Sequence, residues 1–202
     1  MDRKPRLGTY RFADFMELVQ SDQKADLIDG SICFDGPQTV EENDLIGWLL
    51  VVLGQYLEVK KLGRITVNKV AYRLNDHNAP EPDLGIVLGS RVKILKGGYV
   101  DGAPDVAVEV VSPDSVDRDY EDKRLKYEEA GVKEYWILDP DEQQTTFLVR
   151  GEDRHAGFSE HLLENSVFHS TAVPGFWLDV NWLWADPRPA TLAIARQLLG
   201  IQ

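Results

Sequence analysis

Three residues in the middle of the chain have the types and positions that metal-assisted hydrolysis needs. Asp83 follows Pro82 at the start of the apolar segment DLGIVL, and Glu109 lies inside the apolar segment VAVEVVS. A carboxylate among such residues is costly to bury unless it is paired, protonated or bound to a metal. Two carboxylates on neighbouring strands could hold a hard cation through oxygen ligands, and that cation would activate a bound water.

Lys123 is the third residue, and we expect it on the inward face of a helix over residues 117–130. At the 3-4-3 spacing of one helix face the sequence carries Tyr120, Lys123, Tyr127 and Ala130. The tyrosines indicate that this face is turned inward, where a lysine needs a carboxylate partner. Beside a metal, Lys123 could orient water or add positive charge. We therefore expect Lys123→Ala to harm activity more than stability.

Each of these residues also has a simpler interpretation. Taken alone, Asp83 would be a solvated strand-end residue, and Glu109 could equally be a paired structural carboxylate. Lys123 alone would be a surface lysine whose stem covers apolar groups. The combination of two carboxylates and an inward lysine favours phosphodiester hydrolysis over these separate interpretations.

The elements that must position these residues follow from periodicity. Residues 41–60 keep a 3.6-residue apolar period and predict the longest helix, and DLIDGSI predicts a hairpin that turns at Asp29-Gly30. Strands are predicted at RITVNKVAYRL, DLGIVLG, VAVEVVS and KEYWILD, and an antiparallel extension at TTFLVR and FSEHLL. This order predicts an α/β (α+β) fold, a mixed central sheet flanked by helices, in one domain over residues 1–202.

The composition narrows the class of protein. The longest apolar run, residues 45–53, is far shorter than the roughly 20 residues of a bilayer span and predicts a buried helix. The basic N-terminus has no apolar stretch behind it, and the one cysteine, Cys33, cannot form an internal disulfide. We therefore expect a cytoplasmic protein that does not contact membranes.

The charge balance counts against nucleic acid as a partner. The chain has 22 basic and 34 acidic residues, a formal net charge of −12. Proteins that bind phosphates usually carry a basic footprint. Two basic segments, at 60–64 and 123–126, are the candidates for a local basic surface.

The segments that carry these residues also resemble a known family. In order and spacing, PEPDLGIVL, GAPDVAVEVVSPDS and RDYEDKRLKYEEAGVKEYWILDP resemble the Uma2-like family of putative restriction endonucleases, within the PD-(D/E)XK nuclease superfamily. The hairpin DLIDGSI and the late PGFWLDV fit as well, so the resemblance extends roughly over residues 12–180. It implies a restriction-endonuclease-like core and an endonuclease that cuts DNA with Mg²⁺ or Mn²⁺. It also implies that Asp83 and Glu109 bind the metal and that Lys123 is catalytic.

The sequence departs from this pattern at two positions. The wider superfamily has a lysine two residues after the glutamate, where this chain has Val111, but the Uma2-like pattern takes its lysine from the next helix, as Lys123 allows. Members usually have a histidine early in the long helix, where this chain has Glu42 or its neighbour Asn43. Glu42 could be an additional metal ligand, or a helix-start carboxylate that favours the helix dipole.

Two functions therefore compete. One is a metal-dependent endonuclease, favoured by the intact set of Asp83, Glu109 and Lys123, because buried charges without a task only destabilise. The other is an inactive nuclease-fold protein that serves as a binding or assembly module, favoured by the acidic charge and the missing histidine. The aromatic segment FWLDVNWLW is expected to expose apolar surface and so predicts a homodimer.

Overall fold

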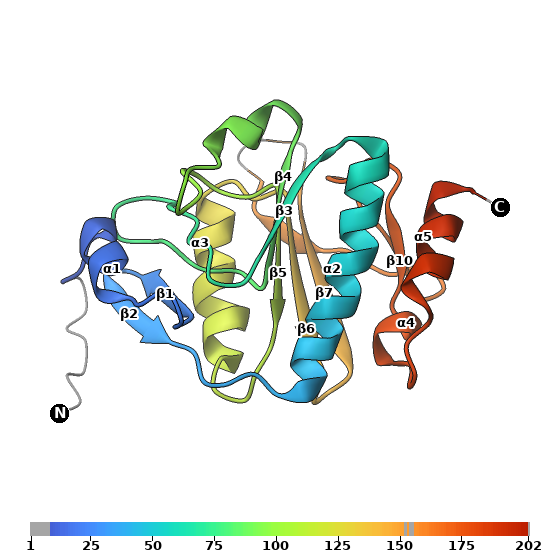
Figure 1. Cartoon of the computed structure of the whole chain (residues 1–202), viewed down its shortest axis with the longest axis horizontal. Helices are drawn as coiled ribbons and strands as arrows, with labels where there is room; N and C mark the ends of the chain where they lie inside the picture. The colour runs from blue at the N-terminus through green and yellow to red at the C-terminus, as the bar shows by residue number, and fades with distance from the viewer. Residues whose placement is uncertain (1–8, 152, 154–155, 202) are drawn as a thin grey trace.

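A mixed β-sheet with a long helix on one face forms the framework of the computed structural model, which describes residues 9–151, 153 and 156–201 (Figure 1). The sheet has six strands in the order β3-β4-β5-β6-β7-β8. Strands β5 and β6 are parallel, and the other neighbours are antiparallel. The strands are β3 (Gly63–Val67), β4 (Leu84–Leu88), β5 (Val106–Val110), β6 (Glu134–Asp139), β7 (Gln144–Arg150) and β8 (Phe158–Glu160). The expected mixed sheet with an antiparallel extension is confirmed.

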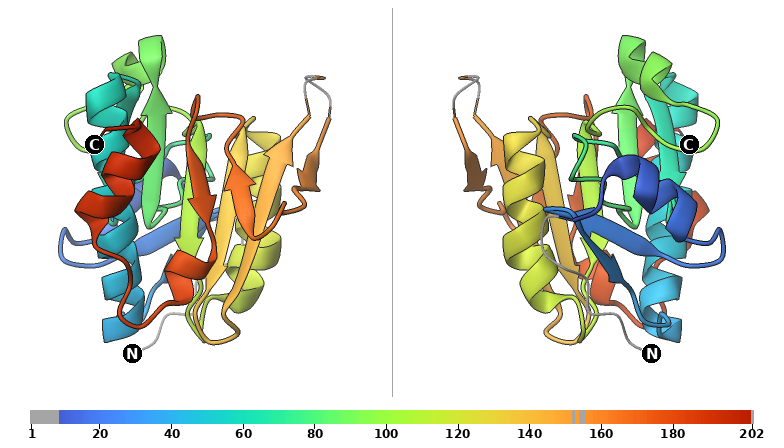
Figure 2. Two further views of the ribbon diagram at one scale, coloured as in Figure 1. Left: turned by 90° about the vertical axis from the view of Figure 1, so that its right-hand side faces the viewer. Right: turned by 90° about the vertical axis from the view of Figure 1, so that its left-hand side faces the viewer.

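Helices cover both faces of this sheet (Figures 1 and 2). The long helix α2 (Val40–Lys60) packs on one face, against Val106, Val108 and Val110 of β5. On the other face, Tyr127 of α3 (Arg124–Glu129) packs against Ala107. Successive side chains of a strand point to opposite faces, so Glu109 faces the same side as Ala107, towards α3.

Helix α2 is the helix predicted for residues 41–60. Its apolar stripe, which includes Leu45, Leu49 and Leu53, is buried against the sheet. Thr39 begins the helix as a capping residue, and Lys61 ends it in the left-handed conformation. Within the part of the chain that the structure describes, no helix combines the length and apolarity needed to cross a membrane.

The predicted hairpin lies beside the sheet and is covered by a short helix (Figure 2). It consists of β1 (Ala25–Ile28) and β2 (Ser31–Phe34), with Asp29 and Gly30 both at positive φ in the turn. All four residues of β1 are buried, because α1 (Phe12–Leu18) and the loop at Ala79 cover the hairpin. A charged residue in β1 therefore lies inside the molecule.

Two predicted elements differ in detail. The strand predicted at RITVNKVAYRL ends at Val67, because Asn68 and Lys69 adopt positive φ and turn the chain. The helix predicted over 117–130 begins with a π-helical turn, η2 (Arg118–Lys123), before α3. The wider turn buries Asp119 on the stripe of Lys123 and Tyr127, whereas Tyr120 is only half-buried.

The aromatic segment near the C-terminus is mostly covered within the chain. It forms β10 (Trp177–Asp179), which pairs with β9 (Val167–His169), and the short helix α4 (Asn181–Trp184). The last helix, α5 (Thr191–Leu199), follows it. Phe176, Leu178 and Leu183 are buried, and the three tryptophans of the segment pack against the core under α2. The expectation that this segment exposes apolar surface is therefore wrong. The homodimer stays a prediction, without that support.

A 3₁₀ helix, η1 (Gly89–Ile94), follows β4. It lies at the end of that strand remote from Asp83.

Candidate active site

Asp83 and Glu109 come together because β4 and β5 are antiparallel neighbours. Leu84 lies opposite Val108, which places Asp83 opposite Glu109. Asp83 is 1% exposed, and its Oδ2 accepts a hydrogen bond from the Val110 backbone N–H at 2.7 Å. The alternative of a solvated strand-end residue is therefore wrong for Asp83.

Glu109 is held by two side chains of the helix above it. Its Oε1 accepts a hydrogen bond from the Tyr127 hydroxyl at 2.9 Å, and its Oε2 lies 3.1 Å from Lys123 Nζ. Glu109 is 1% exposed, and this burial raises the pKa of its carboxyl to about 8, although the Lys123 ammonium opposes the shift. When no further cation is present, this carboxyl can therefore hold a proton near neutral pH.

Lys123 is the centre of a buried ion-pair cluster. It is 1% exposed, and its Nζ lies 3.0 Å from Asp26, 3.0 Å from Asp119 and 3.1 Å from Glu109. Burial alone would lower the pKa of this amine, but Asp119, Asp26 and Glu109 together hold it well above its ordinary value. Lys123 is therefore paired with three carboxylates, so Lys123→Ala should also cost stability, and whether it harms activity more stays a prediction.

A second lysine, which the sequence did not reveal, lies at the other carboxylate. Lys24 Nζ is 2.7 Å from Asp83 Oδ1 and 3.3 Å from Asp35 Oδ2. Its pKa is raised, since Asp83 and other carboxylates outweigh the opposing effect of burial. The amide of Gln38 also donates to Asp83 Oδ1, at 3.3 Å.

Further charges link these groups into one network. Arg118 pairs with Asp26 at 3.3 Å and with Asp35, and the Ser115 hydroxyl donates to Asp119 at 2.5 Å. Burial raises the pKa of Asp26, but Lys123, Lys24 and Arg118 outweigh it, so the net shift is downward. Asp26 could have been suspected on the same grounds as Glu109, because it is a charge inside a short apolar strand.

Glu42 is buried near this cluster but already has a structural partner. Its Oε2 accepts from the Thr39 backbone N–H at 2.8 Å, and Thr39 Oγ1 accepts from the Glu42 N–H at 3.2 Å. This reciprocal pair is a capping box at the start of α2. The helix-start interpretation of Glu42 therefore describes its contacts, and a role as metal ligand stays a prediction.

The cluster surrounds a small space, which we call the inner cavity. Its volume is about 20 Å³, enough for one water or one ion. Its lining includes Lys24, Gln38, Glu42, Asp83, Glu109, Asp119 and Lys123. The structure thus brings together all four residues that the sequence proposed, and adds Lys24, Asp26 and Asp119.

The chemistry of the donors suits a hard divalent cation at Asp83 and Glu109. A carboxylate accepts about four hydrogen bonds. From the described residues Asp83 accepts three hydrogen bonds, and Glu109 accepts one and pairs with Lys123, which leaves oxygen lone pairs on both carboxylates. Among these residues no group of three or more His, Cys, Asp or Glu side chains is arranged to hold a metal. Mg²⁺ keeps several waters and needs only one or two carboxylates, so this pair fits it.

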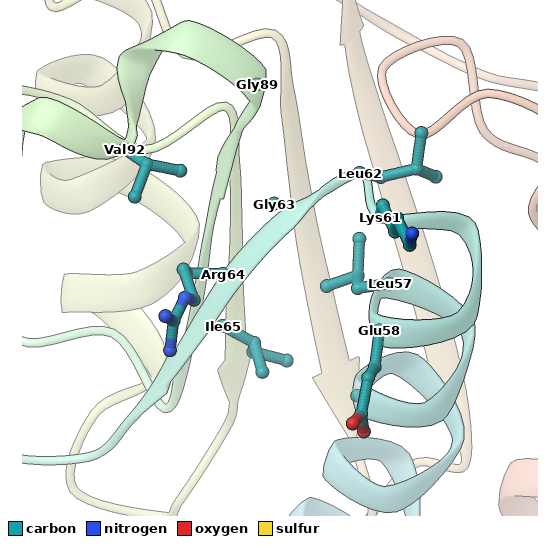
Figure 3. Close-up of a pocket in the computed structure, with 10 residues that line it drawn as sticks. Leu57, Glu58, Lys61, Leu62, Gly63, Arg64, Ile65, Gly89 and Val92 are labelled. Carbon is teal, nitrogen blue, oxygen red and sulfur yellow. The ribbon is translucent and has the colours of Figure 1, made fainter.

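The two basic segments of the sequence have different positions. Lys123 is buried, so it does not contribute to a basic surface at the segment 123–126. Lys61 and Arg64 instead line a groove of about 750 Å³ between the end of α2 and β3, together with Glu58 (Figure 3). This groove lies beyond the far end of β4 from Asp83, because Gly63 pairs with Leu88.

Comparison with known proteins agrees with this architecture. A solved structure with the same fold is that of a putative nuclease belonging to DUF820 from Anabaena variabilis ATCC 29413, with a TM-score of 0.71 and 17% sequence identity. The match covers 86% of this chain and 97% of that chain. The chain therefore has a nuclease-like α+β fold.

A family model gives the more specific assignment. The Uma2 model, described as putative restriction endonuclease, matches residues 12–181. This chain belongs to the Uma2 family. A search of curated proteins finds no match.

Proposed function

We propose that this protein is an endonuclease that hydrolyses DNA phosphodiester bonds with Mg²⁺ or Mn²⁺. The observation that carries the proposal is the inner cavity, where carboxylates from two adjacent strands meet two lysines. Membership of the Uma2 family supports a nuclease, and the donor set supports a hard cation.

In this proposal Asp83 and Glu109 hold the cation. Once bound, the cation would lower the pKa of a water and neutralise charge on the phosphate. The Val110 N–H fixes Asp83, and the Tyr127 hydroxyl fixes Glu109, so both carboxylates are oriented before a ligand arrives. In the reaction the oxygen of a water forms a bond to phosphorus, the bond to one sugar oxygen breaks, and that oxygen takes up a proton.

The test is an assay of the purified protein with single-stranded and double-stranded DNA, in Mg²⁺, in Mn²⁺ and in EDTA. We expect cleavage only with metal, and we expect Asp83→Asn and Glu109→Gln each to lower the rate by orders of magnitude. Calorimetry should show Mn²⁺ binding that Glu109→Gln weakens. Arg196→Gln, which removes an exposed charge from α5, is the control and should behave as wild type.

The proposal fails if wild type cleaves neither form of DNA with Mg²⁺ or Mn²⁺, or if cleavage survives Glu109→Gln unchanged. The second candidate, an inactive nuclease-fold module, would then apply. It is favoured by the protein donors that each oxygen of Asp83 and Glu109 already has, and by the net charge of −12. DNA binding without hydrolysis, or neither activity, would distinguish this candidate from the nuclease.

A further inference from the structure

The two lysines of the inner cavity differ in how many carboxylates surround the amine and in how exposed the side chain is. An ammonium has three donors. Lys123 directs its amine at three carboxylates, Asp26, Asp119 and Glu109, each at 3.0 or 3.1 Å. Carboxylates thus surround this amine, and with 1% of its side chain exposed Lys123 is closed to a ligand.

Lys24 pairs with two carboxylates rather than three, and it donates a hydrogen bond to one of them, Asp83. Lys24 is also the more accessible lysine, with 13% of its side chain exposed against 1% for Lys123.

Lys24 stands where the inner cavity meets a larger opening. This opening, which we call the outer pocket, has a volume of about 390 Å³, within the usual range for a small-ligand site. It shares Lys24, Asp35 and Gln38 with the inner cavity. Its other lining residues include Asp22, Phe34, Asn68 and Lys69. A ligand in the outer pocket therefore reaches the lysine before it reaches Glu109.

The backbone of Lys24 is held by the hairpin, and its amine is held by its contacts with Asp83 and Asp35. Lys24 directly precedes β1, and its carbonyl accepts a hydrogen bond from the Asp35 N–H at 3.1 Å across the hairpin. Gln38, which donates to the same oxygen of Asp83, directly precedes the capping residue of α2. Rigid placement is what a group that stabilises developing charge requires.

We propose that Lys24 contacts the phosphate of the substrate strand, donating an N–H to a non-bridging oxygen while it stays paired with Asp83. This inference rests on the proposed nuclease function, and it assigns the substrate side of the site to the outer pocket. Lys123 then organises the carboxylates from behind. No bond forms or breaks at Lys24, which contributes charge and a hydrogen bond only.

The variant Lys24→Gln tests this, because glutamine keeps a polar chain but loses the charge. Binding of a fluorescein-labelled, nuclease-resistant phosphorothioate oligonucleotide is measured by anisotropy with Mn²⁺ at several salt concentrations. Binding of Mn²⁺ alone is measured by calorimetry. Lys24→Arg keeps the charge and tests rescue, and Arg196→Gln loses the same charge on α5, which packs against the far side of α2 (Figure 1).

We expect Lys24→Gln to weaken oligonucleotide binding several-fold and to lower the salt slope by about 0.7, the contribution of one phosphate contact on a single strand. Mn²⁺ binding should persist or tighten, because an amine no longer competes for Asp83. Lys24→Arg should restore most of the affinity, and Arg196→Gln should match wild type.

Three results would overturn the inference. One is oligonucleotide binding by Lys24→Gln equal to that of Arg196→Gln. Another is joint loss of Mn²⁺ and oligonucleotide binding, which would mean that Lys24 only positions Asp83. The third is a wild type that binds no oligonucleotide. If wild type binds but does not cleave unmodified DNA, the proposed nuclease function fails, while the loss of affinity in Lys24→Gln still supports the contact.

Discussion

Replacing Lys123 by methionine should destabilise the protein strongly, even without metal. Methionine keeps the approximate length of the side chain but leaves Asp26, Asp119 and Glu109 without the ammonium that lies 3.0–3.1 Å from each. Breaking a buried pair by removing one partner costs about 3–5 kcal/mol. We expect a loss of about 4 kcal/mol in the free energy of unfolding at pH 7. For a chain of this size that corresponds to roughly 8–16 °C in melting temperature.

The loss should depend on pH, and this dependence identifies its cause. Without Lys123, the folded protein binds protons at the orphaned carboxylates more tightly than the unfolded chain does. The stability of the variant therefore falls as pH rises through the range where these carboxyls release their protons. The difference from wild type should be smaller at pH 5 than at pH 8.

The assay is urea unfolding of Lys123→Met at both pH values in EDTA. Lys93→Met, at an exposed position on η1, is the control and should change stability by less than about 0.5 kcal/mol. Adding Glu109→Gln to Lys123→Met removes one orphaned charge and should recover about 1 kcal/mol, within the usual range of coupling energies. A loss below about 1 kcal/mol, or a loss that is equal at pH 5 and pH 8, would refute the buried-pair argument.

Three further predictions concern pH, capping and assembly. Burial raises the pKa of Glu81 to about 7, although a hydrogen bond from the Ala25 N–H opposes the shift, so stability should fall by up to about 3 kcal/mol between about pH 4.5 and pH 7. Glu81→Gln should therefore gain stability relative to wild type from pH 5 to pH 8 in urea unfolding, and a constant difference would contradict this. Thr39→Ala removes the cap of α2 and should lower the free energy of unfolding by about 1 kcal/mol, as measured by thermal melting. No change in melting would mean that the capping box does not stabilise the fold. Sedimentation at micromolar concentration tests the homodimer, and a 22.8 kDa species alone would exclude it.

The fold was largely predictable because its signals are local. The apolar segment VAVEVV indicates a strand covered on both faces, and the 3.6-residue period of residues 41–60 indicates the long helix. The end of the strand that begins at Gly63 was not predictable. The turn that ends it depends on positive φ at Asn68 and Lys69, and neither residue is a glycine, the usual signal for such a turn.

The site was predictable only in part, because only some of its residues carry a local signal in the sequence. Asp83 and Glu109 stand out because each is a charge in apolar surroundings, and the strand register then brings them together. Lys24 gives no such signal: it precedes a strand, where a lysine is ordinary, and its partner Asp83 lies 59 residues away. Asp119 was missed because the π-helical turn changes which residues face inward.

The charge of the site as a whole gives an argument that no single residue provides. The ion pairs connect five carboxylates, at Asp26, Asp35, Asp83, Glu109 and Asp119, with three cations, at Lys24, Arg118 and Lys123. With every group ionised this network has a formal charge of −2, equal and opposite to that of one divalent cation. A buried network with uncompensated negative charge should bind protons, and the raised pKa of Glu109 has that direction. Binding of Mn²⁺ should therefore displace a proton from the network, which calorimetry in buffers of different ionisation enthalpy would detect. Mn²⁺ binding near pH 7 without proton release would show that the excess charge is not what attracts the cation.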